Sequence, residues 1–550
     1  MTRLQLMIMA ATGATGLVLA ILLKVEFAWT GGNAFSAPTV ETHCGPVAGD
    51  ISNGVYTFKG IPYAVPPKGE RRWKAPEGLS RENGTCWRGT YKAKQFGPMC
   101  PQHLPTDQSY AGDEDCLYVN IFTPTLNPKA NLPVLVWIHG GYLLFANGNW
   151  PKYGPDEDTS AKLKEYVFVT FNYRLNIFGF LALDLLSSAS PTKHSGNYGF
   201  MDQILVLKWV QRNIKAFGGN PDLVTIYGQS SGGTSVFALM LSPLADGLFH
   251  RAWSISGSPI INKDLATVSK DNLKILEATG CTTLKCLQQL DPKKLVQAME
   301  VLWNYVEEMS DLPTKGNFDA SLIFADGTVI PDLNFKWKDV PFMIGTTAQE
   351  IDMGPVPAEV RTWSQQQYIE YVMTKLDTFG KAISAKALEL YPTSNSSDPE
   401  YLYTSMVSDM RVNCPNDVLA NQAQSSDRTT GVYRYVLTEC PSVPTIAFKG
   451  FSFKAKYAFH NFDNMAFSGH IPNFIESPTA KDIQFQQTVL ENIISFVLTG
   501  SPKASNWKPC PMGTALLGAK VNFSSGVHGY APNKRKFWME NHFYDYAWIN

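Results

Sequence analysis

The feature that most constrains the fold is a tight glycine–serine turn between a predicted strand and a predicted helix. Leu223–Tyr227 is an apolar, β-branched run that stops at Gly228, and residues 231–240 form an apolar stretch of helical character. The turn between them is Gly228-Gln229-Ser230-Ser231-Gly232. A strand that enters a helix through so short a turn strains the central serine and leaves its hydroxyl at the helix N-terminus, where negative charge is favoured. This context predicts Ser230 as a nucleophile. The alternative is an ordinary glycine–serine turn that only begins a helix.

Strands and helices alternate around this turn. Residues 133–138 and 166–171 are short apolar runs typical of buried strands, and residues 199–216 carry apolar side chains at helical spacing. Such alternation predicts the α/β class, with a central, mostly parallel sheet flanked by helices on both faces. Because no repeat or linker interrupts the pattern, we expect one large domain over residues 37–550.

A serine hydroxyl becomes a nucleophile only when a base removes its proton and a carboxylate orients that base. The best candidate carboxylate is Glu350, where an apolar strand opens into a loop, with Asp352 as its nearest competitor. The best candidate base is His460, and His470 is its nearest rival because spacing alone does not separate the two. The catalytic residues are therefore predicted in the chain order Ser, Glu, His.

The predicted strand 133–138 ends in His139-Gly140-Gly141-Tyr142. Glycines allow a backbone turn to direct its N–H groups at a substrate oxygen, as an oxyanion hole requires. We therefore expect the oxyanion to be held near Gly140 and Gly141 and by the N–H of Ser231, the residue after the nucleophile. The alternative is a plain glycine turn after a buried strand.

Charge composition excludes one large class of function. The chain has 47 Lys and Arg against 48 Asp and Glu, and no stretch shows a dense cluster of basic residues. A nucleic-acid partner is not expected, because binding nucleic acid requires neutralising phosphates. The predicted partner is a small molecule, and a serine nucleophile with its base implies no metal and no organic cofactor.

The N-terminus predicts the compartment. Residues 4–23 are almost entirely apolar, with Arg3 before them, so residues 1–36 are predicted as a cleaved signal peptide or an uncleaved signal anchor. Both alternatives place the remaining chain outside the cytoplasm. Membrane attachment is expected only through this segment. Glycosylation sequons agree with that location and begin at Asn83, Asn395 and Asn522.

The chain has 9 cysteines, some of which are near neighbours in sequence. The pairs suggested by proximity are Cys100 with Cys116, Cys281 with Cys286, and Cys414 with Cys440. Cys44, Cys86 and Cys510 are harder to place. An odd total leaves at least one thiol outside any intramolecular disulfide, and buried thiols throughout are the alternative.

Two long motifs make a family resemblance visible. Residues 217–232 resemble the serine signature of the type-B carboxylesterase/cholinesterase family, and residues 114–124 resemble its second signature. The resemblance implies the α/β-hydrolase fold and a secreted or anchored serine carboxylic-ester hydrolase. It also implies a small-molecule ester as the substrate and an acyl-enzyme intermediate. Residue by residue it implies the triad Ser230, Glu350 and His460, the oxyanion neighbours Gly140, Gly141 and Ser231, and the disulfides Cys100–Cys116 and Cys281–Cys286.

Three departures from the family pattern refine the expectation. Tyr142 replaces a third small residue, and Gln229 stands where cholinesterases have Glu. The short segment between Cys100 and Cys116 contains no Trp to stack on a choline cation. A cholinesterase is therefore not expected. The alternatives that we retain are a lipase of the same family and a non-catalytic, neuroligin-like adhesion or binding protein.

Overall fold

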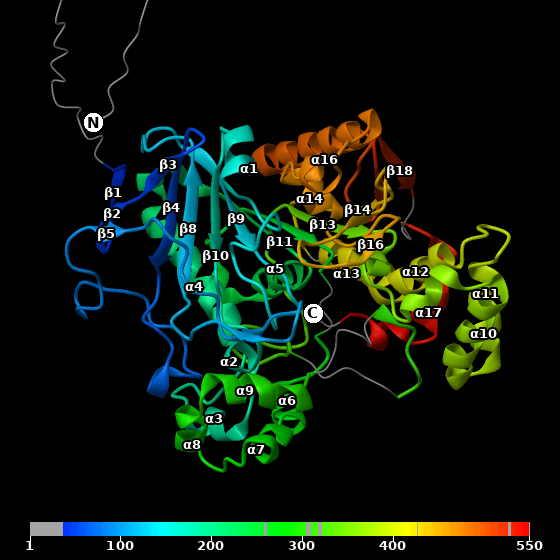
Figure 1. Ribbon diagram of the computed structural model, residues 1–550, viewed down its shortest axis with the longest axis horizontal. Helices are drawn as coiled ribbons and strands as arrows, with labels where there is room; N and C mark the ends of the chain where they lie inside the picture. Colours follow the sequence, from blue (N-terminus) through cyan, green and yellow to red (C-terminus); the bar gives the residue numbers. More distant parts are fainter. Residues whose placement is uncertain are drawn as a thin grey trace, which may run out of the picture. The chain divides into compact units, whose positions relative to one another are not determined.

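A large twisted sheet forms the centre of the computed structural model, which describes residues 37–257, 261–303, 310–316, 322–425, 427–525 and 530–548. Residues 38–550 make one compact unit. The sheet has eleven strands (Figure 1). Their spatial order is β18 (Val521–Ser525), β17 (Gly513–Leu517), β14 (Val432–Leu437), β13 (Phe342–Thr347), β12 (Arg251–Ile255), β11 (Gly219–Gln229), β9 (Leu132–Ile138), β10 (Val167–Phe171), β8 (Tyr118–Thr123), β4 (Val55–Pro62) and β3 (Asp50–Ser52).

The strands from β17 to β10 run parallel to one another, whereas the strands at both edges are antiparallel. Every residue of β10 and of β13 is buried. A continuous apolar strand is expected where helices cover both faces of a parallel sheet. The predicted α/β class with a mostly parallel centre is confirmed.

Alternate side chains of β9 separate the two faces of the sheet. Val134, Val136 and Ile138 belong to a core that includes side chains of α4 (Tyr198–Asn213) and α5 (Ser231–Leu241). Leu135 and Trp137 belong to a second core, which includes side chains of α14 (Phe462–Phe467) and α16 (Ala480–Thr499). Helices therefore cover both faces, as the sequence predicted.

Most of the remaining helices lie in two groups (Figure 1). The helices of the first group come from the part of the chain between β10 and β13: α2 (Asn176–Phe180), α3 (Asp184–Ala189), α6 (Leu265–Asp271), α7 (Lys274–Thr279), α8 (Leu284–Gln289) and α9 (Pro292–Ala298). The other lies beyond β13 and comprises α10 (Gln365–Leu376), α11 (Lys381–Leu390), α12 (Pro399–Ser408), α13 (Cys414–Ser425) and α17 (Pro532–Glu540). Short elements complete the fold: β1 (Thr39–Thr42), β2 (Gly45–Ala48), β5 (Tyr91–Lys92), β6 (Gln102–His103), β7 (Tyr110–Ala111), β15 (Thr445–Ile446), β16 (Lys454–Ala455), α1 (Glu157–Lys162) and α15 (Ile471–Phe474).

Local predictions near the nucleophile agree with the structure. The predicted strands 133–138 and 166–171 are β9 and β10, and the predicted helix 199–216 is α4 followed by a 3-10 turn. β11 is longer than expected, because its pairing with β9 already starts at Gly219, before a shift of register between Gly219 and Val224. The tertiary pairing, and not local apolarity, sets that strand's start.

The structure contains the two disulfides expected from the family, Cys100–Cys116 and Cys281–Cys286. A third joins Cys44 to Cys86. The suggested pairing of Cys414 with Cys440 is wrong, because both are free thiols, as is Cys510. Three disulfides are typical of proteins that fold in an oxidising compartment.

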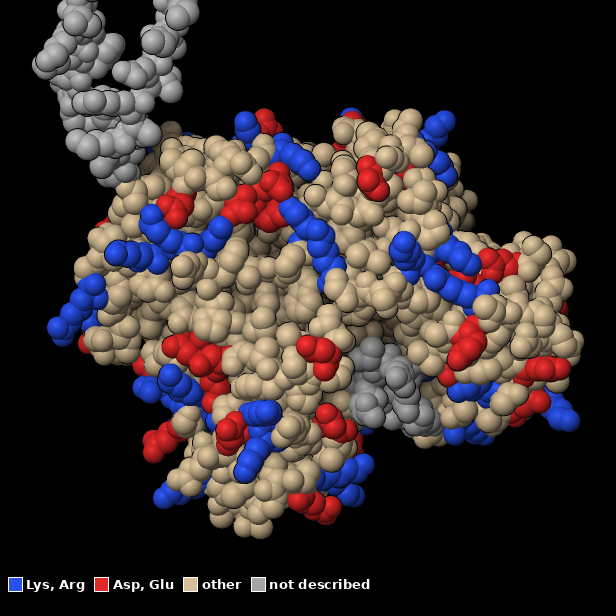
Figure 2. Space-filling model, in the orientation of Figure 1, with Lys and Arg blue, Asp and Glu red and all other residues tan. Residues whose placement is uncertain are grey.

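The predicted signal segment, residues 1–36, lies outside the described residues. Within the described ranges, no helix is long and apolar enough to span a bilayer. Figure 2 shows Lys and Arg side chains interspersed with Asp and Glu on the face in view, with no continuous basic surface there. The side chains of Asn83, Asn395 and Asn522 are exposed, which glycosylation would require.

Candidate active site

The nucleophile turn joins β11 to α5 in one residue. Ser230 has φ 60° and ψ −130°, a conformation that an L-residue adopts only when its surroundings impose it. Its N–H donates to the carbonyl of Ile255 at 2.8 Å. The flanking glycines are required, because a Cβ on Gly228 would lie 2.4 Å from Gly232, and one on Gly232 would lie 2.0 Å from the Ile138 carbonyl. The strained turn predicted from the sequence is therefore present.

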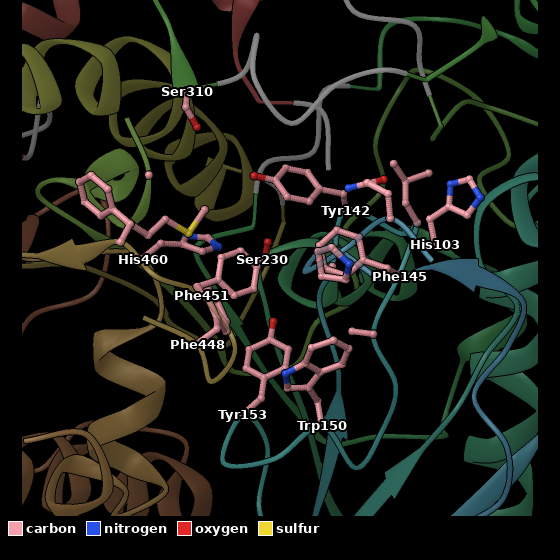
Figure 3. Close-up of a pocket in the computed structure, with 18 of the residues that line it drawn as sticks. His103, Tyr142, Phe145, Trp150, Tyr153, Ser230, Ser310, Phe448, Phe451 and His460 are labelled. Atoms are coloured by element: carbon pink, nitrogen blue, oxygen red, sulfur yellow. The ribbon is translucent and has the colours of Figure 1, made fainter. Parts of the chain in front are cut away.

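Ser230 opens into a cavity of about 590 Å³. His460 lines the same cavity, and Figure 3 shows the two side chains converging near its centre. Aromatic side chains make much of the wall, namely Tyr142, Phe145, Trp150, Tyr153, Trp303, Phe448, Phe451 and Phe453. Glu300 is the only Asp, Glu, Lys or Arg among the described lining residues. The chamber around the serine is therefore largely apolar.

Glu350 holds His460 by a short hydrogen bond between buried groups. His460 Nδ1 lies 2.6 Å from Glu350 Oε2, and neither side chain is more than 1% exposed. A carboxylate accepts hydrogen bonds and cannot donate one, so His460 Nδ1 carries the proton in this contact. Nε2 is then the unprotonated, basic nitrogen. Nε2 makes no hydrogen bond to a described residue. The arrangement suits a base that acts on a hydroxyl inside the cavity.

The structure separates the candidates that spacing left open. His470 is buried away from the cavity, with its Nδ1 3.2 Å from the Lys152 carbonyl and its Nε2 3.4 Å from an Asp156 carboxylate oxygen. Asp352 accepts the backbone N–H groups of Lys456 and Tyr457, both at 2.7 Å. These contacts make His470 and Asp352 structural partners of neighbouring backbone and side chains.

Glu350 has two further donors, which the sequence reasoning missed. Its Oε1 accepts the Ser256 hydroxyl at 2.7 Å and the Thr347 N–H at 2.6 Å. Ser256 follows β12, which lies between the strands that carry the nucleophile and the acid. The sequence analysis predicted no strand before Ser256, so nothing in it pointed to this contact.

The glycine turn after β9 differs from the prediction at one residue. The N–H of Gly140 donates to the Tyr153 hydroxyl at 3.1 Å, and Gly140 does not line the cavity. Gly141 and Tyr142 do line it, and no hydrogen bond from their N–H groups to a described residue is found. In this structure the N–H of Gly140 is thus directed at Tyr153 and not into the cavity. The phenol of Tyr142 is neutral, since burial raises its pKa to about 12.

Two other groups border the Glu350–His460 pair. The indole of Trp548 packs edge-to-face against the His460 ring, with centroids 5.2 Å apart. Asp463 is buried beside the pair, where its carboxyl group accepts the Tyr435 hydroxyl at 2.7 Å and the Asn464 N–H at 2.9 Å. Burial raises the pKa of Asp463 to about 6, and the nearby Glu350 charge adds to the rise. Among the described side chains, no cluster of His, Cys, Asp or Glu could hold a metal ion.

The parallel sheet, the strained serine turn and the buried Glu–His pair define a serine hydrolase with the α/β-hydrolase fold. Comparison with known proteins gives the particular family. The model of the Carboxylesterase family matches residues 36–538, and the chain belongs to that family. The protein is accordingly a serine carboxylesterase by class.

The chain is similar to esterases over most of its length. Para-nitrobenzyl esterase of Bacillus subtilis is 33% identical over 491 residues, which are 85% of this chain and 91% of that protein. Bile salt-activated lipase of Homo sapiens is 30% identical over 461 residues, 77% of this chain and 58% of the lipase. Among solved structures, a thermophilic PNB esterase superposes with a TM-score of 0.70 at 29% identity and covers 91% of this chain and 100% of its own.

Proposed function

We propose that this protein hydrolyses carboxylic esters at Ser230, with His460 as the base and Glu350 as the group that orients it. The observation that carries the proposal is the 2.6 Å contact between His460 Nδ1 and Glu350 Oε2 beside a serine in the strained turn. A charge-assisted hydrogen bond between two buried groups fixes both the tautomer and the direction of the imidazole ring.

The reaction then proceeds in two halves. Ser230 Oγ attacks the ester carbonyl while His460 Nε2 takes the hydroxyl proton, and the tetrahedral intermediate collapses as Nε2 returns that proton to the leaving alcohol. In the second half, His460 Nε2 takes a proton from a water molecule, whose oxygen attacks the acyl-serine carbonyl. The bond to Ser230 Oγ then breaks as Nε2 returns the proton to Oγ, which releases the carboxylic acid and restores the serine. Glu350 remains ionised throughout and stabilises the imidazolium.

The negative oxygen of each intermediate needs backbone donors. We assign this role to the N–H groups of Gly141, Tyr142 and Ser231, in place of the predicted set that included Gly140. Gly141 and Tyr142 line the cavity next to Ser230, and the N–H of Ser231 opens the first turn of α5. One such donor contributes on the order of 3 kcal/mol to transition-state stabilisation.

The cavity supports uncharged, largely apolar esters as substrates. Its aromatic wall gains from burying apolar groups, and among the described lining residues no Lys or Arg would meet a substrate carboxylate. An anionic ester would lose hydration without compensation. A lipase remains the closest alternative within the enzyme class, since it differs mainly in the length of the acyl chain that it accepts.

We further propose an extracellular or luminal location, with residues 1–36 as a signal peptide or signal anchor and with glycans on Asn83, Asn395 and Asn522. The three disulfides support an oxidising compartment. Mass spectrometry of the protein secreted from a eukaryotic host, before and after deglycosylation, tests the mature N-terminus and the three sites together.

The decisive experiment is covalent labelling with a fluorophosphonate followed by mapping of the modified peptide. The expected adduct lies on Ser230. The Ser230→Ala protein should form no adduct, and its kcat for a short aryl ester should be lower by a factor on the order of 10⁴–10⁶. Labelling elsewhere would refute the assignment of the nucleophile. A folded protein without any labelling or turnover would favour the non-catalytic, adhesion-type alternative.

A further inference from the structure

The loop that carries the oxyanion donors has an unfavourable backbone. Tyr142, Leu143 and Ala146 are not glycines, yet their φ angles are 57°, 60° and 77°. Each left-handed residue costs roughly 1–2 kcal/mol relative to the right-handed helical conformation. Three in five residues would relax unless other groups held them, so the contacts that restrain this loop bear directly on catalysis.

One restraint comes from the residue after the nucleophile. The Ser231 hydroxyl oxygen accepts the N–H of Leu143 at 3.0 Å, and both residues are fully buried. The bond ties the loop to the first turn of α5 at the residue after Tyr142. The carbonyl of Leu143 accepts the N–H of Asn176 at 2.7 Å, so both backbone polar groups of Leu143 are held.

A second restraint comes from the disulfide loop. The Gln102 side chain is fully buried, and its amide makes two bonds to Ala146: Oε1 accepts the Ala146 N–H at 2.7 Å, and Nε2 donates to the Ala146 carbonyl at 3.0 Å. Nε2 also donates to the Cys100 carbonyl at 2.8 Å. Cys100 is bonded to Cys116, so the far end of the strained segment is attached to a covalently closed loop.

We propose that the Ser231 hydroxyl and the Gln102 amide are positioning residues that hold the strained 141–146 loop so that its N–H groups meet the oxyanion. This inference rests on the proposed ester hydrolysis. The side chain of Ser231 acts separately from its own N–H, since Ser231→Ala removes the hydroxyl and keeps the backbone donor. Gln102 touches no reacting group and acts through Ala146.

The test compares transition-state binding with ground-state binding in Ser231→Ala and Gln102→Leu. A trifluoromethyl ketone adds to a catalytic serine as a hemiketal whose oxygen occupies the oxyanion hole, and the matching secondary alcohol does not. We expect kcat for p-nitrophenyl butyrate and affinity for the ketone to fall together by about 10- to 100-fold, because complete removal of a donor costs 10²–10³. KM and affinity for the alcohol should change less than about threefold.

Two variants control for the loss of internal hydrogen bonds. Ser254→Ala removes a buried hydroxyl that donates to the Gly233 carbonyl of α5. Gln211→Leu removes a half-buried amide that donates to the carbonyls of Pro221 and Leu248. Both should retain the kcat and the ketone affinity of the unsubstituted protein. Thermal melts of all four variants show which of them fold.

The outcomes are distinct. Folded Ser231→Ala and Gln102→Leu proteins with unchanged kcat would overturn the inference, as would equal losses in ketone and alcohol affinity. If Ser231→Ala does not fold, Gln102→Leu alone decides by the same criterion. An unsubstituted protein that neither hydrolyses the ester nor binds the ketone would overturn the proposed function as well, whereas active but insensitive variants overturn this inference only.

Discussion

Replacing Glu350 with Gln tests whether the buried carboxylate directs His460 as the proposed catalytic base. One carboxylate oxygen accepts two donors, the Ser256 hydroxyl at 2.7 Å and the Thr347 N–H at 2.6 Å. Glutamine has a single oxygen, and those two donors will retain it. The amide NH₂ must then face His460 Nδ1, which the native carboxylate oxygen approaches to 2.6 Å.

The size of the effect follows from the tautomer. An NH₂ group donates only, so Nδ1 must become an acceptor and the ring proton must move to Nε2. The nitrogen that should take the serine proton is then already protonated. The same acid-to-amide change in a Ser-His-Asp triad lowers kcat about 10⁴-fold, and we expect a loss of that order, or about 5.4 kcal/mol at 1.36 kcal/mol per tenfold.

Folding should not suffer from Glu350→Gln. The change removes a buried charge and leaves the two donors to Oε1 satisfied, so the thermal midpoint should stay equal or rise. Initial rates with p-nitrophenyl butyrate, the rate of fluorophosphonate labelling and a thermal melt measure both effects. Asp352→Asn is the matched acid-to-amide control and should lose less than about tenfold in kcat. A folded Glu350→Gln protein that keeps more than a tenth of the native kcat would refute the reasoning.

Three further predictions separate competing roles of neighbouring groups. His460→Ala should lower kcat as much as Ser230→Ala does. His470→Ala should keep kcat within about tenfold of the native value and lower the thermal midpoint. A larger loss of kcat in His470→Ala than in His460→Ala would exchange the roles of the two histidines. Burial raises the pKa of Asp352 to about 7. Between about pH 4 and 7 the Asp352 carboxyl therefore keeps a proton in the folded protein that it has lost in the unfolded chain. The free energy of unfolding falls as pH rises through this window. The stability of Asp352→Asn relative to the native protein should therefore increase by on the order of 2 kcal/mol from pH 5 to pH 8 in denaturant titrations, and a constant difference would contradict the shift. Butyrylcholine and 3,3-dimethylbutyl butyrate should have kcat/KM values within about fivefold of each other in parallel assays.

Local chemistry explains what the sequence could predict. The strained serine turn depends on residues that are adjacent in the chain, and the two flanking glycines mark it without reference to the rest of the fold. The short apolar runs of β9 and β10 likewise predict buried strands from local sequence alone. The Glu350–His460 contact joins residues 110 positions apart. Its prediction came from the family resemblance, since spacing alone left His470 as a rival.

The remaining features depend on tertiary contacts that no local pattern encodes. Gly140 was expected to supply an oxyanion donor, but Tyr153 accepts its N–H while donating to the Gln229 side chain at 2.6 Å. Ser256 reaches Glu350 only because β12 lies between β11 and β13 in the sheet. Sheet order requires knowledge of which strands pair, so neither contact could be derived from the chain alone.

The expectation of weak choline selectivity needs a firmer basis than the absence of Trp between Cys100 and Cys116. The structure places Trp150 and Trp303 in the cavity wall, and both come from other segments. The only acid among the described lining residues is Glu300, whose side chain is 65% exposed and lies 3.6 Å from the His103 ring. A charge so exposed attracts a cation with about 1 kcal/mol at 4 Å in water, which is roughly fivefold. A desolvated cation–π contact is worth about 2 kcal/mol, or about thirtyfold. A choline preference near fivefold that disappears in Glu300→Gln would thus be electrostatic. A preference above thirtyfold that survives this substitution would require an aromatic face of the cavity wall, such as that of Trp150 or Trp303, and would refute the prediction.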